Sequence, residues 1–378
     1  MISITGIGAV SSCGSGIKSL VEHMHEGRDS STPLSLFPLP FKDEIRVNQV
    51  KSAPSGDEGS RIDALVLNAM EEAIAEAGLN KKKLSDSAFI LGSSGFLFEA
   101  EEEYRQQKEK GITKPAPLAR RGSGHVASRL AKQLGINGPV LTLTTACTSS
   151  ANAMIAAANM LKSGEVRRAV IVGAEALSTI TLSGFRSLML LAPNGCKPFD
   201  AKRQGIQLGE AYAVLILEPN KAAKNKLCGW ANLCDTHNVI STNMDGRLIQ
   251  QTMASALSCA NINPGQIIAV KAHGTGTIDN DTAEGAGMRL VFDSKAPPFT
   301  ALKGYVGHTL GACGAIETAA FLGCLHAGFI PPAIGFDQQD PSIGISPIKS
   351  PMEALHGYYM LNFFGFGGNN TSLVLSYG

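Results

Sequence analysis

One cysteine of this sequence stands where a nucleophile is expected. Cys147 lies between a β-rich run and a helical pattern of small residues that begins at Ser149. At a helix N-terminus, unpaired N–H groups and the positive end of the helix dipole stabilise the thiolate, which is the reactive form of cysteine. Ser150, Ala151 and Ala153 leave room for a ligand to approach this helix. The competing interpretation is a buried structural cysteine, because the chain contains eight cysteines.

Two histidines occupy comparable positions in the second half of the sequence. His273 ends an apolar run and is followed by glycines and by Thr275 and Thr277. His308 precedes a helical pattern rich in glycine and alanine. A histidine that leaves a strand into a glycine-rich turn is placed as active-site residues commonly are in α/β folds. Each histidine alone is equally compatible with a structural hydrogen bond.

Taken together, the cysteine and the two histidines form a more specific pattern than any one of them. They are the groups needed to attack a thioester. A zinc site is the alternative, and its ligands would be Cys147, His273, His308 and Asp281. These residues belong to separate glycine-rich segments, which favours close approach of a substrate over a compact metal cage. The pattern therefore predicts nucleophilic catalysis without a metal.

Short β-rich runs alternate with longer helical patterns, which predicts an α/β layered fold. In the first part we expect strands at 2–10, 87–94, 139–146, 168–176 and 212–219, and helices at 61–78, 125–135 and 149–161. In the second part we expect strands at 227–235, 267–274 and 358–376, and helices at 250–260, from Thr282 onward, and at 307–325. The two parts, residues 1–219 and 220–378, have matching element order, which indicates an internal duplication.

The composition limits the class of protein. The 378 residues are 44% hydrophobic and 17% charged, which is typical of a globular protein with a large core. The net charge of +1 provides no overall attraction for nucleic acid or for a membrane, and neither is expected as a partner. No apolar run is long enough to span a membrane. The scattered cysteines lack CxxC spacing, which favours reduced thiols and a cytoplasmic protein.

Several motifs connect these residues to a known family. They are TACTSS around Cys147, KPFDAKRQG, GEAYAVLILE, HGTGT, NDTAE, KGYVGHTLGACGA and NFFGFGGNN. With these motifs the sequence resembles the β-ketoacyl synthase family of the thiolase superfamily along essentially its whole length. It is similar to the elongating Cys-His-His branch, rather than to the initiating branch or the thiolases. The resemblance implies a thiolase-like fold, in which two duplicated α/β halves form a layered α-β-α-β-α core.

The resemblance also implies a reaction. Cys147 takes an acyl chain from acyl carrier protein as a thioester, and malonyl-carrier protein then loses carbon dioxide to give the carbanion that attacks it. His273 and His308 polarise the malonyl thioester carbonyl. Lys303 and Glu317 match the buried charged pair that supports the histidine loop, or alternatively serve only as an ion pair between helices. The phosphopantetheine is carried by the partner, and the enzyme has no cofactor of its own.

The resemblance also implies a role for the glycine-rich loop near the C-terminus. The backbone N–H groups of Cys147 and Phe366 match the family's oxyanion hole, and Phe366 matches its acyl-pocket gate. Gly365 and Gly367 allow such a loop to move and to approach a substrate closely.

Other features of the resemblance concern substrate and partners. Thr275 and Thr277 match positions that bind the pantetheine arm, although stabilisation of the turn is the alternative. An acidic carrier protein requires a local basic patch. The expected docking residues are Arg120, Arg121, Lys202 and Arg203, with an internal salt bridge as the alternative for Arg203. A homodimer is expected first, and a heterodimer with a related ketosynthase-like subunit second.

Three positions depart from the family pattern. Thr148 stands where serine is usual, Ala211 ends a Gly-Glu-Gly motif, and Asn369 alters the C-terminal GGTN motif. None of them removes a reacting group. Both fatty-acid synthesis and a specialised polyene or polyketide-like lipid pathway remain open. The alternatives are a subunit of a ketosynthase/chain-length-factor heterodimer and a thiolase-like acyl-CoA condensing enzyme.

Overall fold

The computed structural model describes most of the chain. The described residues are 1–51, 61–95, 101, 104, 107–112, 122–219, 222–238, 242–293 and 296–378. Within them, no helix combines the length and the apolar character needed to cross a membrane.

The first half of the fold is a mixed sheet. Its strands in chain order are β1 (Ile2–Ser11), β5 (Ala88–Gly92), β6 (Val140–Leu143), β7 (Ala169–Glu175) and β8 (Ala211–Pro219). Across the sheet their order is β6-β5-β7-β8-β1. β5 runs parallel to β6 and β7, whereas β8 runs antiparallel to β7 and β1.

The second half repeats this arrangement. Its strands in chain order are β9 (Asn225–Cys234), β10 (Ile267–Ala272), β11 (Phe299–Ala301), β14 (Gly357–Phe364) and β15 (Asn369–Tyr377). Their order across the sheet is β11-β10-β14-β15-β9, with the same pattern of parallel and antiparallel pairs. β1 and β9 pair over a short stretch and join the two halves. The matching topology explains why the sequence shows the same order of elements twice.

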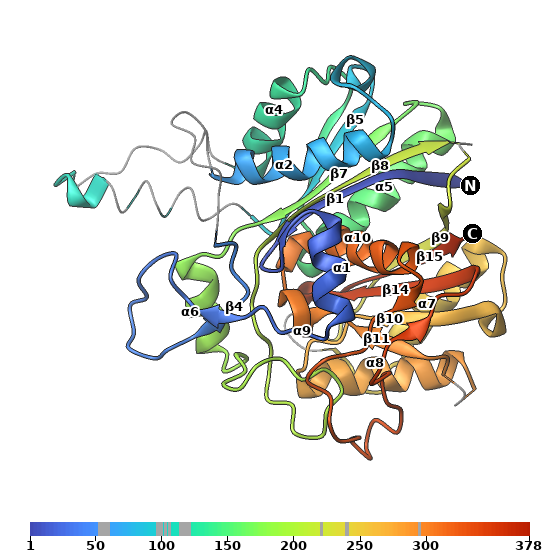
Figure 1. Ribbon diagram of the computed structural model, residues 1–378. Coiled ribbons are helices and arrows are strands. Elements are labelled where there is room, and N and C mark those ends of the chain that lie inside the picture. Colours follow the sequence, from blue (N-terminus) through green and yellow to red (C-terminus); the bar gives the residue numbers. More distant parts are fainter. Residues whose placement is uncertain are drawn as a thin grey trace.

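Helices separate and cover the two halves, as Figure 1 shows. α2 (Arg61–Glu76) and α4 (Ser123–Gln133) cover the first half, and α7 (Arg247–Ala260) and α8 (Ile278–Val291) cover the second. α5 (Ser149–Ser163) and α10 (Cys313–His326) lie between the halves. This confirms the predicted layered α-β-α-β-α fold.

The two central helices cross very closely. All residues of α10 from Cys313 to Leu325 are buried, as expected of a helix that is apolar on every side. A Cβ atom at Gly314 would lie 2.0 Å from the backbone nitrogen of Ala151 in α5. Only glycine therefore allows the helix that follows His308 to pack against the helix that follows Cys147.

Some predicted boundaries differ from the structure. The segment 307–325 is not one helix, because 3-10 helix η5 (Leu310–Ala312) precedes α10. α8 begins at Ile278, before the predicted start at Thr282. The segment 358–376 folds as the antiparallel hairpin β14–β15. The sequence interpretation also missed α1 (Ile17–His25), α6 (Thr179–Ser187) and α9 (Lys303–Val306), which are short and bounded by turns.

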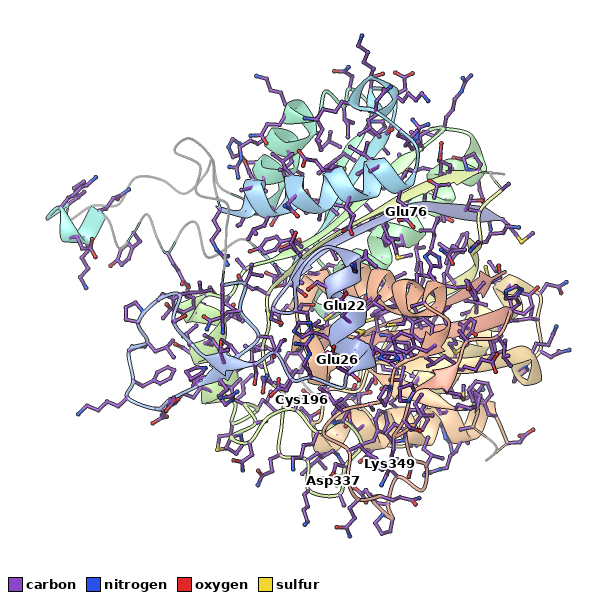
Figure 2. The ribbon with its side chains drawn as sticks, viewed as in Figure 1. Glu22, Glu26, Glu76, Cys196, Asp337 and Lys349 are labelled. Carbon is purple, nitrogen blue, oxygen red and sulfur yellow. The ribbon has the colours of Figure 1, made fainter. Side chains whose placement is uncertain are left out.

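Small elements complete the described structure. They are β2 (Gly14–Ser15), β3 (Thr32–Pro33), β4 (Arg46–Val47), β12 (Phe329–Ile330) and β13 (Met352–Glu353). Figure 2 places Asp337 and Lys349 together at the lower end of the molecule, and Lys349 Nζ donates to the Asp337 carbonyl oxygen at 2.7 Å. Cys196, above them in the same view, donates through Sγ to the carbonyl oxygen of Thr275 at 3.3 Å. The Asp337 and Gln338 backbone N–H groups donate to Asp200 Oδ2, each at 2.7 Å, so the loop containing Asp337 packs against the segment that follows Cys196.

Candidate active site

The predicted nucleophile lies in a sharp turn at the start of α5. Cys147 belongs to 3-10 helix η3 (Ala146–Thr148), which leads directly into α5, and its side chain is buried. Ala146 has a φ of 51°, which is unusual for a residue other than glycine. A strained turn between strand and helix is the geometry that presents a nucleophile at the top of a sheet. The structure therefore agrees with the predicted position of this cysteine.

Opposing effects act on the pKa of the Cys147 thiol. Burial raises the pKa of Cys147 to about 11, although the Lys303 charge and the Phe366 and Cys147 backbone N–H groups act to lower it. Removal of the sulfur from water outweighs the lysine charge and these two donors. The buried site therefore favours the thiol over the thiolate.

The rings of the two predicted histidines lie next to one another. Their ring centroids are 5.4 Å apart and the rings are nearly perpendicular. His273 Nδ1 lies 3.3 Å from Lys303 Nζ, and His308 Nδ1 accepts the Leu310 backbone N–H at 2.9 Å. Because a donor faces each Nδ1, the proton of each neutral ring must be on Nε2.

Both rings are held in the neutral form. Burial lowers the pKa of His273 and of His308 well below the usual range, and the Lys303 charge adds to this effect. Two neutral Nε2–H groups are suitable donors to an oxygen on which negative charge develops.

The predicted pair Lys303 and Glu317 is part of a buried cluster with a second lysine. Glu317 Oε1 lies 2.5 Å from Lys303 Nζ, and Oε2 lies 2.6 Å from Lys271 Nζ. Burial opposes the charged form of Glu317, but the two lysines hold its pKa below the usual value. The sequence interpretation missed Lys271, although a lysine within the apolar strand IIAVKA indicates a buried charge.

Two further carboxyl groups hold the loops of the site and were also missed. Glu284 accepts the backbone N–H groups of His273 at 2.8 Å and Gly274 at 2.9 Å. Glu175 accepts the backbone N–H of Gly311 at 3.0 Å, in the turn after His308. Burial raises the pKa of each carboxyl group to about 7. Each carboxyl therefore anchors the backbone of a histidine segment.

The predicted gate lies between two cavities. Phe366 lines a cavity of about 280 Å³ together with Cys147, and also a second cavity of about 270 Å³ that contains Thr277 and Gly365. Its ring stacks on Phe185 at a centroid distance of 5.7 Å. Phe366 therefore borders both cavities, and its role as a gate stays a prediction.

The loop around this phenylalanine depends on its glycines. Gly367 has a φ of 78°, a left-handed conformation that favours glycine. A Cβ atom at Gly365 would lie 3.3 Å from the backbone nitrogen of Cys147, so the loop packs directly on the nucleophile's turn.

Thr148 and Asn369, two of the residues that depart from the family pattern, are hydrogen-bonded to each other. Thr148 Oγ1 donates to Asn369 Oδ1 at 2.7 Å, and Asn152 Nδ2 donates to the same oxygen at 2.8 Å. The backbone oxygen of Asn369 accepts the Gly365 N–H at 2.9 Å. These bonds connect the turn that carries Cys147 with the loop that carries the gate.

The two threonines differ in their surroundings. Their hydroxyl groups are 2.8 Å apart, and Thr275 N–H donates to Asp281 Oδ1 at 3.0 Å. Only Thr277 lines the cavity. Thr275 thus contributes hydrogen bonds to the turn, and binding of the pantetheine arm stays a prediction for both threonines. Asp281, considered above as a metal ligand, instead accepts backbone N–H groups, and the described residues contain no cluster suited to a metal ion.

The proposed docking patch requires a correction. Arg203 is buried, and its guanidinium lies 2.5 Å from the Asp340 carboxylate. Arg203 therefore forms an internal salt bridge and is not a docking residue. Lys202 is exposed, whereas Arg120 and Arg121 lie outside the described residues.

Comparison with known proteins agrees with this geometry. Residues 1–223 match the beta-ketoacyl synthase N-terminal domain, and residues 226–337 match the C-terminal domain. The chain is 28% identical to nodulation protein E of Rhizobium leguminosarum bv. trifolii, covering 99% of this chain and 98% of the relative. It is 27% identical to 3-oxoacyl-[acyl-carrier-protein] synthase 2 of Synechocystis, covering 99% and 97%.

Solved structures show the same similarity. The ishigamide ketosynthase/chain length factor matches with a TM-score of 0.90 at 28% identity, covering 100% of this chain and 99% of that chain. The ketosynthase ApeO, in complex with its chain length factor ApeC from Xenorhabdus doucetiae, matches with a TM-score of 0.87 at 26% identity, covering 100% and 98%. Both matches extend over the two halves of the fold and the site between them. This chain therefore belongs to the β-ketoacyl synthase family.

Proposed function

We propose that this protein catalyses decarboxylative condensation between an acyl group and a malonyl thioester carried by acyl carrier protein. The observation that carries the proposal is the pair of neutral Nε2–H imidazoles, His273 and His308, in a buried site with the thiol of Cys147. The synthase from Synechocystis named above acts on acyl-carrier-protein substrates by its name, and we extend that substrate class to this chain.

The first half-reaction is acyl transfer to the cysteine. The Cys147 sulfur loses its proton and attacks the acyl thioester carbonyl, and the carrier thiol leaves with a proton. The backbone N–H groups of Cys147 and Phe366 act on the sulfur, so a carbonyl oxygen beside it lies within reach of the same donors.

The second half-reaction is condensation. The two Nε2–H groups bind the malonyl thioester oxygen, and loss of carbon dioxide leaves the bonding electrons in an enolate on that oxygen. The enolate carbon attacks the acyl-cysteine carbonyl, and the thiolate of Cys147 leaves. The product is a 3-oxoacyl thioester on the carrier, one unit of two carbons longer.

Intact-mass measurement tests this function. Incubation with a panel of acyl-carrier proteins should add the mass of the acyl group to the enzyme, and malonyl-carrier protein should then discharge it as a 3-oxoacyl product. The matching coenzyme A thioesters should load at least about tenfold more slowly, because they lack the protein surface that steers docking. Equal or faster loading from coenzyme A would favour the thiolase-like alternative instead.

We infer a dimer, with a homodimer as the first choice. β6 is the edge strand of the first half, and its Val140 and Leu141 are 36% and 39% exposed. The cavity beside Cys147 is lined by Ile180 and Leu188, which are also largely exposed in the single chain. Apolar residues in these positions suit burial by a second subunit.

Sedimentation velocity at assay concentration should give the mass of two chains. A fully active monomer would contradict the proposed dimer. Activity that appears only after a related ketosynthase-like subunit is added would identify the heterodimer, which the ApeO–ApeC complex makes the second candidate.

The remaining parts of the proposal concern organisation and location. The halves 1–219 and 220–378 are proposed as the two structural units. Eight free cysteines support a reducing, cytoplasmic location. The phosphopantetheine is proposed to arrive on the carrier protein, with no further cofactor. Lys202 remains the candidate for docking that carrier.

A further inference from the structure

A second lysine lies inside the histidine site and has no part in the mechanism above. Lys271, on β10, is fully buried. Its ammonium lies 2.6 Å from Glu317 Oε2, 2.6 Å from the Asn362 carbonyl oxygen and 3.6 Å from the Phe363 ring centroid. These contacts come from two elements, α10 and β14, so the lysine is held firmly in one place.

Charge balance in the buried core does not require the ammonium group of Lys271. Lys303 alone already pairs with the Glu317 carboxylate, and one lysine with one glutamate would make a neutral buried pair. An apolar side chain at position 271 would cost less desolvation than an ammonium group. Burial lowers the pKa of Lys271 to about 8, although Glu317 opposes this shift, so below that pH the three side chains carry a net charge of about +1.

We propose that Lys271 is a positioning residue for the two catalytic imidazoles. It binds one oxygen of Glu317 and thereby directs the other oxygen to Lys303. Its positive charge adds to the burial and the Lys303 charge that keep the imidazoles neutral. This inference deepens the proposed function and rests on it for its catalytic meaning.

The neutral state matters because of the contact at His273. Protonation of this ring would place an N–H on Nδ1, 3.3 Å from the ammonium of Lys303. Two donors would then face one another, and the lysine or the ring would have to move. A charge that prevents this protonation therefore preserves the direction of the Nε2–H group.

Other ionisable groups also surround the two rings. Lys303 comes from α9, Cys313 from α10 and Glu284 from α8. Burial raises the pKa of Cys313 to about 12, so this thiol stays neutral although its sulfur lies 3.2 Å from His308 Nδ1. Burial raises the pKa of Glu284 to about 7, and it therefore offsets part of the lysine charge above that pH. The effect of Lys271 is thus greatest on the acid side.

The test is titration of the histidine rings by ¹⁵N nuclear magnetic resonance in the full-length protein. In Lys271→Met the pKa of His273 and of His308 should rise by about one unit, a tenfold change in the ratio of imidazolium to imidazole. The sign follows because removal of a nearby positive charge favours the imidazolium. Lys81→Met removes the same charge from an exposed site and should leave both titrations unchanged.

The same variant should alter the reaction. The acid limb of the pH profile for malonyl decarboxylation should move to higher pH in Lys271→Met, and Lys271→Arg should move it back by restoring the charge. Folded Lys271→Met protein with unchanged ring titrations would overturn the proposal. If that variant does not fold, Lys271→Gln is measured in the same way. Rings of the unmodified enzyme that titrate near the usual value would also overturn it, because the charge would then have no effect.

The two readouts separate this inference from the proposed function. Shifted ring titrations in a protein without condensing activity would reject the function and retain the role of Lys271 in the electrostatics. Normal condensation with unshifted titrations would retain the proposed function and reject the role of Lys271.

Discussion

Replacing Cys147 with alanine should reduce condensation by more than about 10⁴-fold, because the residue that forms the covalent bond is removed. No acyl-enzyme should be detected by intact mass. Decarboxylation of malonyl-carrier protein should persist, because it depends on the two imidazoles and not on the sulfur. The measurement is release of carbon dioxide in parallel with product formation.

The matched control is Cys259→Ala, which removes an exposed cysteine on α7. This variant should load and condense at the rate of the unmodified enzyme. If folded Cys147→Ala protein still forms a mass-detectable acyl-enzyme and a 3-oxoacyl product, the nucleophile has been assigned wrongly and the mechanism fails.

Replacing His273 or His308 with alanine should depress malonyl decarboxylation by about 10²- to 10³-fold, the usual loss when one donor to a developing oxyanion is removed. Each ring supplies one Nε2–H group, and the second ring cannot take the place of the first. Carbon dioxide release from malonyl-carrier protein, measured without an acyl donor, isolates this effect from acyl transfer.

Acyl loading in the same variants should become strongly dependent on pH. Burial places the pKa of Cys147 at about 11, so the thiolate fraction should rise about tenfold per pH unit between pH 7 and 9. Loading that is fast and independent of pH in both variants would contradict the raised pKa of the thiol.

His326→Ala provides the control for these variants. This histidine lies at the opposite end of α10 from the site and contacts Asn225. Its replacement should leave decarboxylation and loading within about twofold of the unmodified enzyme. A loss comparable to that of the active-site variants would show that the measured effects reflect general destabilisation.

Local patterns were sufficient to predict most of the layered fold. Runs such as 168–176 and 212–219 are buried on both faces, so their apolar character is continuous and easy to recognise as strands. α1 and α6 escaped prediction because short helices between turns carry little periodic signal. The start of α10 was misplaced because small residues before it, from Gly307 onward, are compatible with a helix as well as with a turn.

The sequence by itself determined the family and the residues expected to react, and its element order indicated an internal duplication. Cys147, His273 and His308 stand in motifs whose residue types carry the chemistry, and such motifs can be read without coordinates. The protonation states were decided only by the tertiary structure. Burial raises the pKa of Cys147 to about 11, and Lys271 joins Glu317 across two elements that are distant in the chain. Desolvation and charge act through space, so their balance depends on which groups the fold brings together and on how much water it removes from them.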